Sequence, residues 1–244
     1  MCDFSSYSVT FENMLIVAHA VPLERVRLKV PPELQLDTVK GPEGEEFALV
    51  TMTCFLNRDL QWLPSGEENF DFHQAVFGTY VRYGEESGVY IIGNFLERGT
   101  PLVFERMIMK NSYAADFDIS LGYDEENRSY GHYYCEVLSS KGDTVVEVTS
   151  AGDEPTASLP FKSGNEMLAF MTQRHVQYFL MIGGGIGKIE MDFGATNPVN
   201  ADLLNGEFGY WEDLDILREE EFEDTYAVLI QPSIEMMVHA PKAC

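Results

Sequence analysis

One lysine lies in a stretch that could give it unusual chemistry. In "FERMIMKNSYAAD" (residues 104–116), Lys110 follows Met107, Ile108 and Met109. Apolar surroundings lower the pKa of a lysine amine because burial disfavours its charged form, and the neutral amine is a nucleophile. Such an amine forms an imine with a carbonyl compound. The alternative is a charge at the edge of a strand, and this stretch alone leaves both interpretations open.

The other patterns with familiar chemistry fail on their spacing. "MIGGGIGKIE" (181–190) resembles a phosphate-binding loop, but Ile182 and Ile189 occupy positions that require Gly and then Ser or Thr. We expect this segment to be a flexible connection between a helix and a strand, with glycines for unusual backbone angles. The five histidines have no metal-binding spacing, and the sequence has no serine-hydrolase elbow. The sequence therefore predicts no metal and no cofactor.

The chain is strongly acidic. Its 16 basic and 40 acidic residues give a formal net charge of −24. Phosphate backbones and anionic membrane surfaces are bound by clustered Lys and Arg, so we expect neither a nucleic acid nor a membrane as partner. Self-repulsion that keeps the protein soluble is the simplest interpretation of the acidity. A small molecule, as ligand or substrate, is the expected partner.

The cysteines and the N-terminal segment predict a cellular compartment. Cys2, Cys54, Cys135 and Cys244 form no CxxC pair, which fits free thiols in a reducing compartment better than a disulfide framework or a zinc site. No Lys or Arg precedes Arg25, and the apolar run "MLIVAHAV" is short. We therefore expect neither a signal peptide nor a membrane span, and a cytoplasmic protein.

Most of the elements that would position a site are strands. Five segments are rich in β-branched and aromatic residues and are separated by turn residues such as "GEESG" and "SSKGD". They are residues 47–55, 75–83, 88–96, 143–150 and 226–240. The second and third of them read as a hairpin with a short acidic loop.

Helical signals are fewer. "PLERVRLKV" (22–30) starts with Pro, and the prolines of "VPPEL" end it. "SGNEMLAFMTQRHVQYFL" (163–180) places apolar residues near one face, with Ser163 as the N-cap. Many strands with two or three short helices indicate an α+β protein, dominated by an antiparallel sheet that curls into a barrel.

Several stretches, taken in order, resemble the acetoacetate decarboxylase-like superfamily. "VPPELQLD" (30–37) resembles its Val-Pro-x-x-Leu-x-Leu-Asp segment, and "FHQAVFGTYVRYGEESGVYIIGNFLE" (72–97) resembles its next hairpin. "GNEMLAFMTQRHVQYFL" (164–180) is similar to the "fLteRY.ly" helix of the YqjF-like bacterial branch. "FGATNPVNADLLN" (193–205) stands where that branch has a His-x-Pro-Trp-x-Leu-like segment. The chain resembles this branch more closely than the true decarboxylases.

The resemblance implies a cone-shaped antiparallel β-barrel with an apolar cavity, formed by residues 1–244 as a single domain. In the decarboxylases, a cavity lysine within Arg-Glu-x-x-Gly-x-Pro-Lys-Lys forms a Schiff base with a β-keto acid. When that motif is aligned on Arg106, Tyr113 takes the place of the lysine, and tyrosine cannot form an imine. Lys110 lies three residues before Tyr113, so in a regular strand the two side chains point to opposite faces. A bulge between them would reverse this.

The resemblance also supplies four candidate site residues. Arg106 would pair with a substrate carboxylate, and Tyr113 would donate a hydrogen bond to a carbonyl or enolate oxygen. His19 lies near the position of a cavity Arg and could act as an acid or a base. Gln74 stands where the decarboxylases have a cavity Glu, so its neighbour His73 should point away. Each of these side chains could instead be structural.

Three functions follow, in this order. The first is an enzyme with lyase-like chemistry on a small oxo acid or polyketide-like carbonyl compound, without a Schiff-base lysine. Enolisation, hydration, condensation or cyclisation would then use Tyr113, Arg106, His19 and Gln74. The second is a barrel that binds a small ligand without catalysis, and the third is decarboxylation through Lys110. The resemblance is also compatible with a homo-oligomer.

Overall fold

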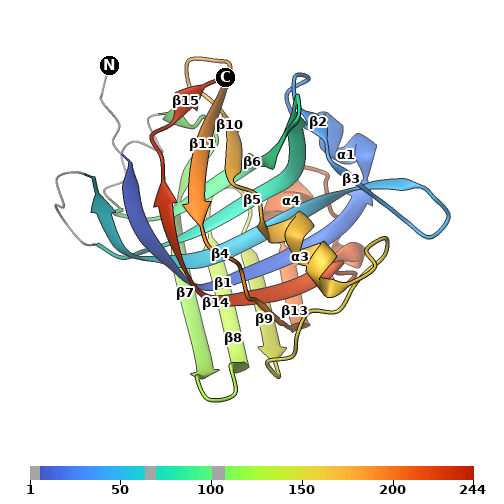
Figure 1. Cartoon of the computed structure of the whole chain (residues 1–244), viewed down its shortest axis with the longest axis vertical. Coiled ribbons are helices and arrows are strands. Elements are labelled where there is room, and N and C mark those ends of the chain that lie inside the picture. Colours follow the sequence, from blue (N-terminus) through green and yellow to red (C-terminus); the bar gives the residue numbers. More distant parts are fainter. Residues whose placement is uncertain (1–5, 64–69, 101–107) are drawn as a thin grey trace.

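The computed structural model describes residues 6–63, 70–100 and 108–244, and strands make up most of it (Figure 1). The long strands are β1 (Tyr7–Pro22), β4 (Glu46–Trp62), β5 (Phe72–Tyr83), β6 (Glu86–Glu97), β7 (Ser112–Asp124), β8 (Ser129–Leu138), β9 (Thr144–Ser150), β10 (Val176–Leu180), β11 (Ile186–Phe193), β13 (Asp202–Phe208) and β14 (Ala227–Val238). The short strands are β2 (Gln35–Leu36), β3 (Thr38–Lys40), β12 (Val199–Asn200) and β15 (Lys242–Ala243). The helices are α1 (Leu23–Arg27), α3 (Gly164–Thr172), α4 (Gly209–Asp213) and the 3₁₀ turn η1 (Glu219–Glu221).

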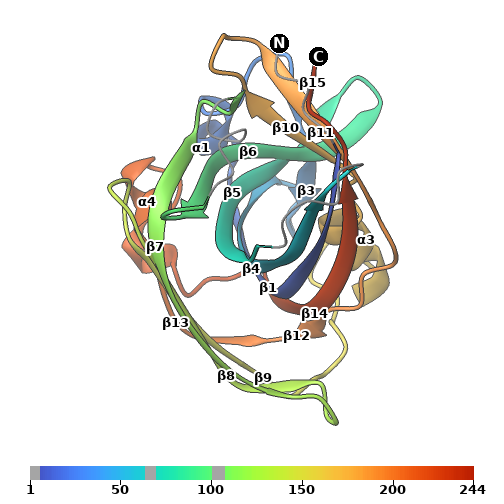
Figure 2. The same ribbon diagram turned by 90° about the vertical axis from the view of Figure 1, so that its left-hand side faces the viewer.

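Seven strands close into a ring in the order β5, β6, β10, β11, β14, β1, β4 and back to β5 (Figure 2). All neighbours in the ring are antiparallel except β6 and β10. Closure leaves no free strand edge within the ring and encloses a lumen. The expectation of a mostly antiparallel, barrel-forming α+β protein is confirmed.

A second antiparallel layer branches from the ring at β6. The strands β7, β8, β9 and β13 form it, and Figure 2 shows them curving past one side of the ring. The edge of β6 that pairs with β10 near Tyr90 pairs with β7 from Asn94 onward. Between these two partners the carbonyl of Ile92 accepts a hydrogen bond from the Tyr210 hydroxyl at 3.0 Å. Gly93 is required here, because a Cβ on it would lie 2.5 Å from the Tyr210 oxygen.

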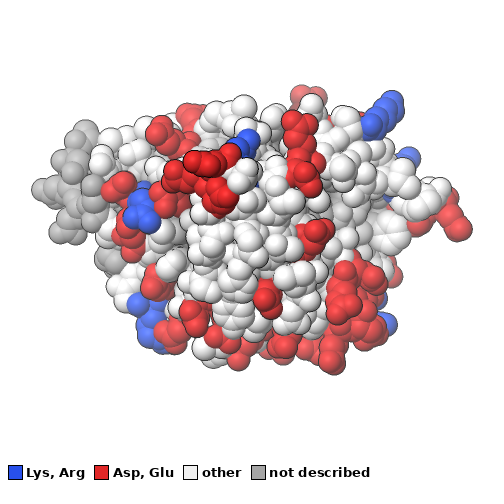
Figure 3. Space-filling model, turned by 90° about the horizontal axis from the view of Figure 1, so that it is seen from below, with Lys and Arg blue, Asp and Glu red and all other residues white. Residues whose placement is uncertain are grey.

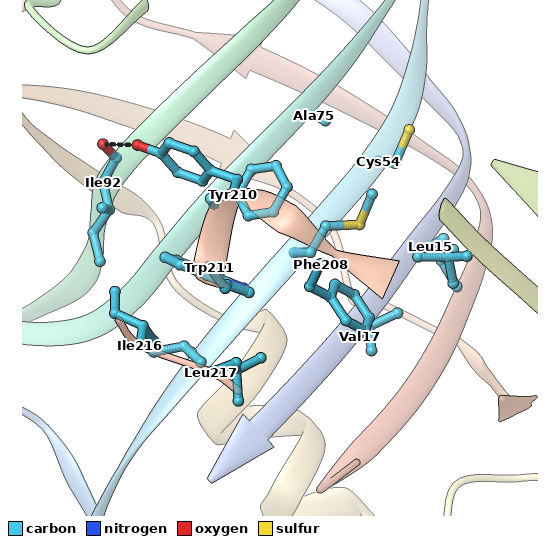
Figure 4. Packing of buried hydrophobic residues seen from close by; sticks show 14 of the residues in the cluster. Leu15, Val17, Cys54, Ala75, Ile92, Phe208, Tyr210, Trp211, Ile216 and Leu217 are labelled. Atoms are coloured by element: carbon cyan, nitrogen blue, oxygen red, sulfur yellow. Dashed lines mark hydrogen bonds between the residues drawn. The ribbon is translucent and has the colours of Figure 1, made fainter. Parts of the chain in front are cut away.

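Side chains alternate between the two faces of the ring strands, and this alternation produces two apolar clusters. One cluster contains residues of all seven ring strands and, among the described residues, none of β7, β8, β9 or β13; we call it the lumen cluster. Its members include Phe55 and Val76. The other cluster fills the space between the ring and the outer layer, and we call it the intersheet cluster (Figure 4). Because successive side chains of a strand point to opposite faces, Cys54 and Ala75 belong to the intersheet cluster while their neighbours line the lumen.

The helix α4 anchors the outer layer to the ring. Tyr210 and Trp211 are buried, and each packs edge-on against Phe77 of β5, at ring separations of 4.9 and 5.2 Å. Cys54 of the ring and Cys135 of the outer layer meet in the same cluster with their sulfurs 3.2 Å apart. The intersheet cluster is therefore the interior that holds the two layers together.

The expected strands and the β5–β6 hairpin are confirmed, but the expected helix over 163–180 is only half right. Ser163 caps α3 by accepting a hydrogen bond from the Glu166 amide, and α3 ends at Thr172. The second half, Val176–Leu180, is β10, because its β-branched and aromatic residues pair with both β11 and β6. The glycine-rich segment after it therefore connects two strands, not a helix and a strand, with positive φ at Gly184 and Gly185.

No helix in the described part of the chain is long and apolar enough to cross a bilayer.

We expect the F77A variant to destabilise the fold by about 3–5 kcal/mol, because it removes the ring against which Tyr210 and Trp211 pack. Chemical denaturation followed by circular dichroism measures the change. L204A, at a side chain that is 58% exposed on β13, is the control and should shift stability by less than about 0.5 kcal/mol. A loss for F77A as small as that of the control would contradict the role given to the intersheet cluster.

Candidate functional site

The lumen of the ring contains a cavity of about 90 Å³. Every ring strand contributes to its wall, and α3 contributes Met171 and Thr172 at one end. The wall is mostly apolar and includes four methionines, whose flexible side chains adapt to different contents. A cavity of about 150 Å³ holds benzene, so this one has room for a molecule of only a few heavy atoms. The polar residues of the described wall are Thr51, Thr53, Tyr80, Thr172, Arg174, Gln177 and Thr196.

A chain of buried polar side chains lies in the lumen beyond the end of the cavity that is opposite α3. The Asn57 amide donates to Gln74 Oε1 at 3.1 Å, and Gln74 Nε2 donates to Asn94 Oδ1 at 2.8 Å. Asn94 Nδ2 in turn donates to the Ser112 hydroxyl at 3.1 Å. Gln74 is two residues from the cavity-lining Val76 and shares its face of β5. Gln74 is therefore on the lumen face, as expected, and His73 points outward to Glu97, 3.1 Å from its Nδ1.

The end of the cavity beside α3 carries a charged side chain that our sequence analysis missed. Arg174 lies just after α3, lines the cavity, and has a side chain only 9% exposed. Its Nη2 lies 3.0 Å from Asp37 Oδ2, and its Nε donates to the Phe170 carbonyl at 2.6 Å. The guanidinium also lies over the rings of Phe170 and Tyr80, 4.4 and 5.4 Å from their centroids. The signal was the Arg in the "fLteRY"-like stretch, which we used only as a helix signature.

His19 lies on the other face of the ring wall. It is buried, its ring lies 4.9 Å from that of Phe208, and its Nε2 is 3.0 Å from the Phe222 carbonyl. A carbonyl only accepts, so Nε2 carries the proton. Burial lowers the pKa of His19, although the hydrogen bond to Phe222 and the nearby Asp224 oppose this. His19 is thus a neutral hydrogen-bond donor within the intersheet region.

Tyr113 also packs on the intersheet side. Its ring lies 5.3 Å from that of Phe95 and 6.4 Å from that of Tyr210, and the Lys141 amine lies 5.4 Å from its centroid. Burial, and secondly the neighbouring Tyr113 hydroxyl, raise the pKa of Tyr210. The structure thus separates Tyr113 and His19 from Gln74 by the thickness of the ring wall.

Of the two remaining candidates, the structure describes Lys110, which lies in the turn just before β7. Lys110 is exposed, and its backbone amide donates to the Leu180 carbonyl at 2.8 Å. The preceding Met109 is buried in the lumen cluster, whereas Lys110 belongs to the turn before β7 and is not among the residues of that cluster. Arg106 lies outside the described residues.

A comparison with family models places most of this chain in one family. The model of the DUF2071 family, described as "Uncharacterized conserved protein (COG2071)", matches residues 8–203. No curated protein matches the chain.

Three solved structures illustrate the likeness in fold. An acetoacetate decarboxylase from Legionella pneumophila has a TM-score of 0.64 at 14% identity, with 98% of this chain and 87% of that one covered. An acetoacetate decarboxylase-like enzyme from Sphingomonas wittichii RW1 has a TM-score of 0.62 at 10% identity, with coverage of 99% and 94%. The enduracididine biosynthesis enzyme MppR, complexed with pyruvate, has a TM-score of 0.61 at 11% identity, with coverage of 100% and 91%. At these identities the likeness establishes an acetoacetate decarboxylase-like fold.

We expect the H19N variant to flatten the pH dependence of stability. Because the pKa of His19 in the folded protein lies below its ordinary value of 6.5, the unfolded chain binds the extra proton first. The stability that neutral His19 contributes is therefore present above pH 6.5 and is lost as the pH falls through the folded pKa, by at most about 1.4 kcal/mol per pH unit. Urea unfolding of wild type and H19N between pH 7 and 5 measures this. The exposed His132 gives the control H132N, and equal slopes for wild type and H19N would contradict the assignment.

We expect the Q74L variant to lose about 1–3 kcal/mol of stability, because it removes a hydrogen-bond partner from both Asn57 and Asn94 inside the lumen. The control is Q35L on the exposed surface of β2, with an expected change below about 0.5 kcal/mol. Denaturation midpoints of both variants give the comparison. A neutral Q74L would mean that the buried amide chain does not stabilise the lumen.

Proposed function

We propose a ligand-binding function for this chain, which belongs to the DUF2071 family: its barrel lumen holds a small carbonyl compound by noncovalent contacts. The observation that carries the proposal is the cavity whose wall is built by all seven ring strands. Ligand sites are typically concave and mostly apolar, with a few polar groups that fix orientation. The threonines, Gln177 and Arg174 are such groups in this wall.

A carbonyl compound is favoured by the neighbours in fold. The MppR structure contains pyruvate, and the Legionella pneumophila protein is an acetoacetate decarboxylase. Pyruvate and acetoacetate are both comparable in size to benzene, so a cavity of about 90 Å³ holds them only when the flexible methionine side chains of its wall make room. We carry the class over to this chain, not the reactions.

Noncovalent binding is favoured by the chemistry of the wall. An imine requires a lysine amine that reaches the ligand. Among the described wall residues the charged one is Arg174, whose guanidinium stays protonated and does not form imines. Lys110 is exposed and is not among the described residues of the lumen cluster or of the cavity wall.

Transformation of the bound compound is the second candidate, and the position of Gln74 favours it. Among the site residues that we predicted from the sequence and that the structure describes, Gln74 shares the lumen face with the cavity wall, and its amide is held by Asn57 and Asn94. A preorganised amide stabilises an enolate oxygen without the reorganisation that water requires. In this version Arg106 would bind the substrate, and the chemistry would be lyase-like.

Saturation-transfer NMR with 2-butanone and 2-oxobutyrate tests binding in the lumen. We expect both compounds to bind wild type and V145F, and at least tenfold weaker binding to V76F, because the larger side chain fills the cavity. Val145 is half-buried on β9 of the outer layer and gives the matched control. Circular dichroism establishes that both variants are folded. Binding that V76F leaves unchanged, or no binding to wild type, would refute the proposal.

Two further readouts on the same samples separate the candidates. When borohydride is added to the protein mixed with 2-oxobutyrate or with acetoacetate, the intact mass of the protein should not change. A genuine acetoacetate decarboxylase, treated in parallel with acetoacetate, should gain the mass of the reduced imine adduct. An adduct on Lys110 would restore the Schiff-base reading. Proton NMR over hours distinguishes binding from turnover, because enolisation in D₂O exchanges the protons next to the carbonyl.

A further inference from the structure

Arg174 gives the lumen a cation at one end. Its side chain is 9% exposed and lines a cavity that is otherwise apolar or neutral among the described residues. A buried guanidinium is costly unless charge and hydrogen-bond partners compensate for its lost water. The partners of Arg174 therefore decide whether it is a closed structural ion pair or an incomplete site.

The hydrogen bonds of Arg174 are incomplete. Its Nε donates to the Phe170 carbonyl and its Nη2 pairs with Asp37, but Nη1 has no hydrogen-bond partner in the described part of the chain. Arg carries five N–H donors, and the two on Nη1 remain available. Nη1 is also not among the fully buried polar atoms that lack a partner, so it is reachable from solvent or from the cavity.

The local charges are also unbalanced. Asp37 is shared by two guanidinium groups, with Arg174 Nη2 at 3.0 Å and Arg82 Nε at 3.5 Å. Two cations and one carboxylate leave this cluster with a net positive charge, inside a chain whose formal net charge is −24. One further carboxylate would complete both the charge balance and the donor set of Arg174.

We propose that Arg174 is the specificity-determining residue of the lumen and selects a ligand that carries a carboxylate beside its carbonyl and apolar part. The inference rests on the proposed function, and it narrows the ligand class to small oxo acids. The ligand carboxylate would accept from Nη1, and its apolar part would lie against the methionines and phenylalanines of the wall. Asp37 keeps its contact with Nη2, partly neutralises the guanidinium and repels the ligand carboxylate.

The test compares two ligands of four carbons, the anion 2-oxobutyrate and the neutral ketone 2-butanone, by isothermal titration calorimetry. We expect wild type to bind the acid at least tenfold more tightly than the ketone. R174Q should lose this preference while its ketone affinity stays within twofold of wild type. D37N should bind the acid several-fold more tightly than wild type, because it removes a negative charge that partly neutralises Arg174 and repels the ligand carboxylate.

The controls exclude a general effect of charge or of stability. R58Q removes a guanidinium that pairs with Glu12 and Asp71 and does not line the cavity, so it should leave both affinities unchanged. If R174Q does not fold, D37N still decides, because a purely structural ion pair predicts no gain in acid affinity. Equal affinities for acid and ketone, with no gain in D37N, would overturn the role of Arg174 and leave the lumen as a neutral-ligand site. Failure of both ligands to bind wild type would overturn the proposed function as well.

Discussion

One edge of β6 serves two different strands, and the rest of the structure depends on how it is divided. The first part of the edge pairs with β10 and closes the ring, and the last part pairs with β7 and starts the outer layer. At the division the Ile92 carbonyl accepts from Tyr210, and the adjacent Gly93 leaves room for that hydroxyl. A buried carbonyl without a partner is costly, so α4 must dock at this point for the branch to form. The lumen and the intersheet cluster are both consequences of this junction.

The strand content could be read from the sequence because local patterns specify it. Alternation and turn residues located the β5–β6 hairpin, and a capping serine located the start of α3. The end of α3 could not be read in the same way. Apolar residues in 163–180 fit one helical face, and only the tertiary pairing of β10 with β6 and β11 overrides that pattern. Closure of the ring is likewise a long-range event, because it pairs Tyr90 of β6 with Tyr178 of β10, 88 residues later.

We could predict from the sequence on which strands the candidate site residues lie, but not reliably which face of the strand each side chain occupies. A resemblance assigns residues to strands, and an uncertainty of one position moves a side chain to the other side of the wall. Gln74 was placed on the lumen face, whereas His19 and Tyr113, which the resemblance put near the cavity, pack on the intersheet side. Ser112, the neighbour of Tyr113, is the residue that reaches the buried amides. Arg174 was not predicted as a site residue, because its role depends on its contacts in the folded protein and it belongs to no catalytic motif.

The surface charge and the lumen have opposite electrostatic characters. Acidic side chains predominate on the face in Figure 3 and are spread across it rather than gathered in one patch. Such a field repels anions at long range, but salt screens it over about 8–10 Å. Arg174 acts within the lumen, where a short-range contact is screened much less. Approach to the protein and recognition in the cavity are therefore governed by different charges.

The ring wall also separates two structural requirements, the shape of the cavity and the packing of the outer layer. Residues that face inward pack in the lumen cluster with one another and with α3, whereas residues that face outward hold the second layer in place. Because the two sets alternate along the same strands, an inward substitution changes the shape of the cavity without disturbing the packing around Trp211 and Phe77. Barrels of this architecture can thus hold different molecules while the packing between their layers stays the same. The same fold occurs in solved proteins that share only 10–14% of their residues with this chain.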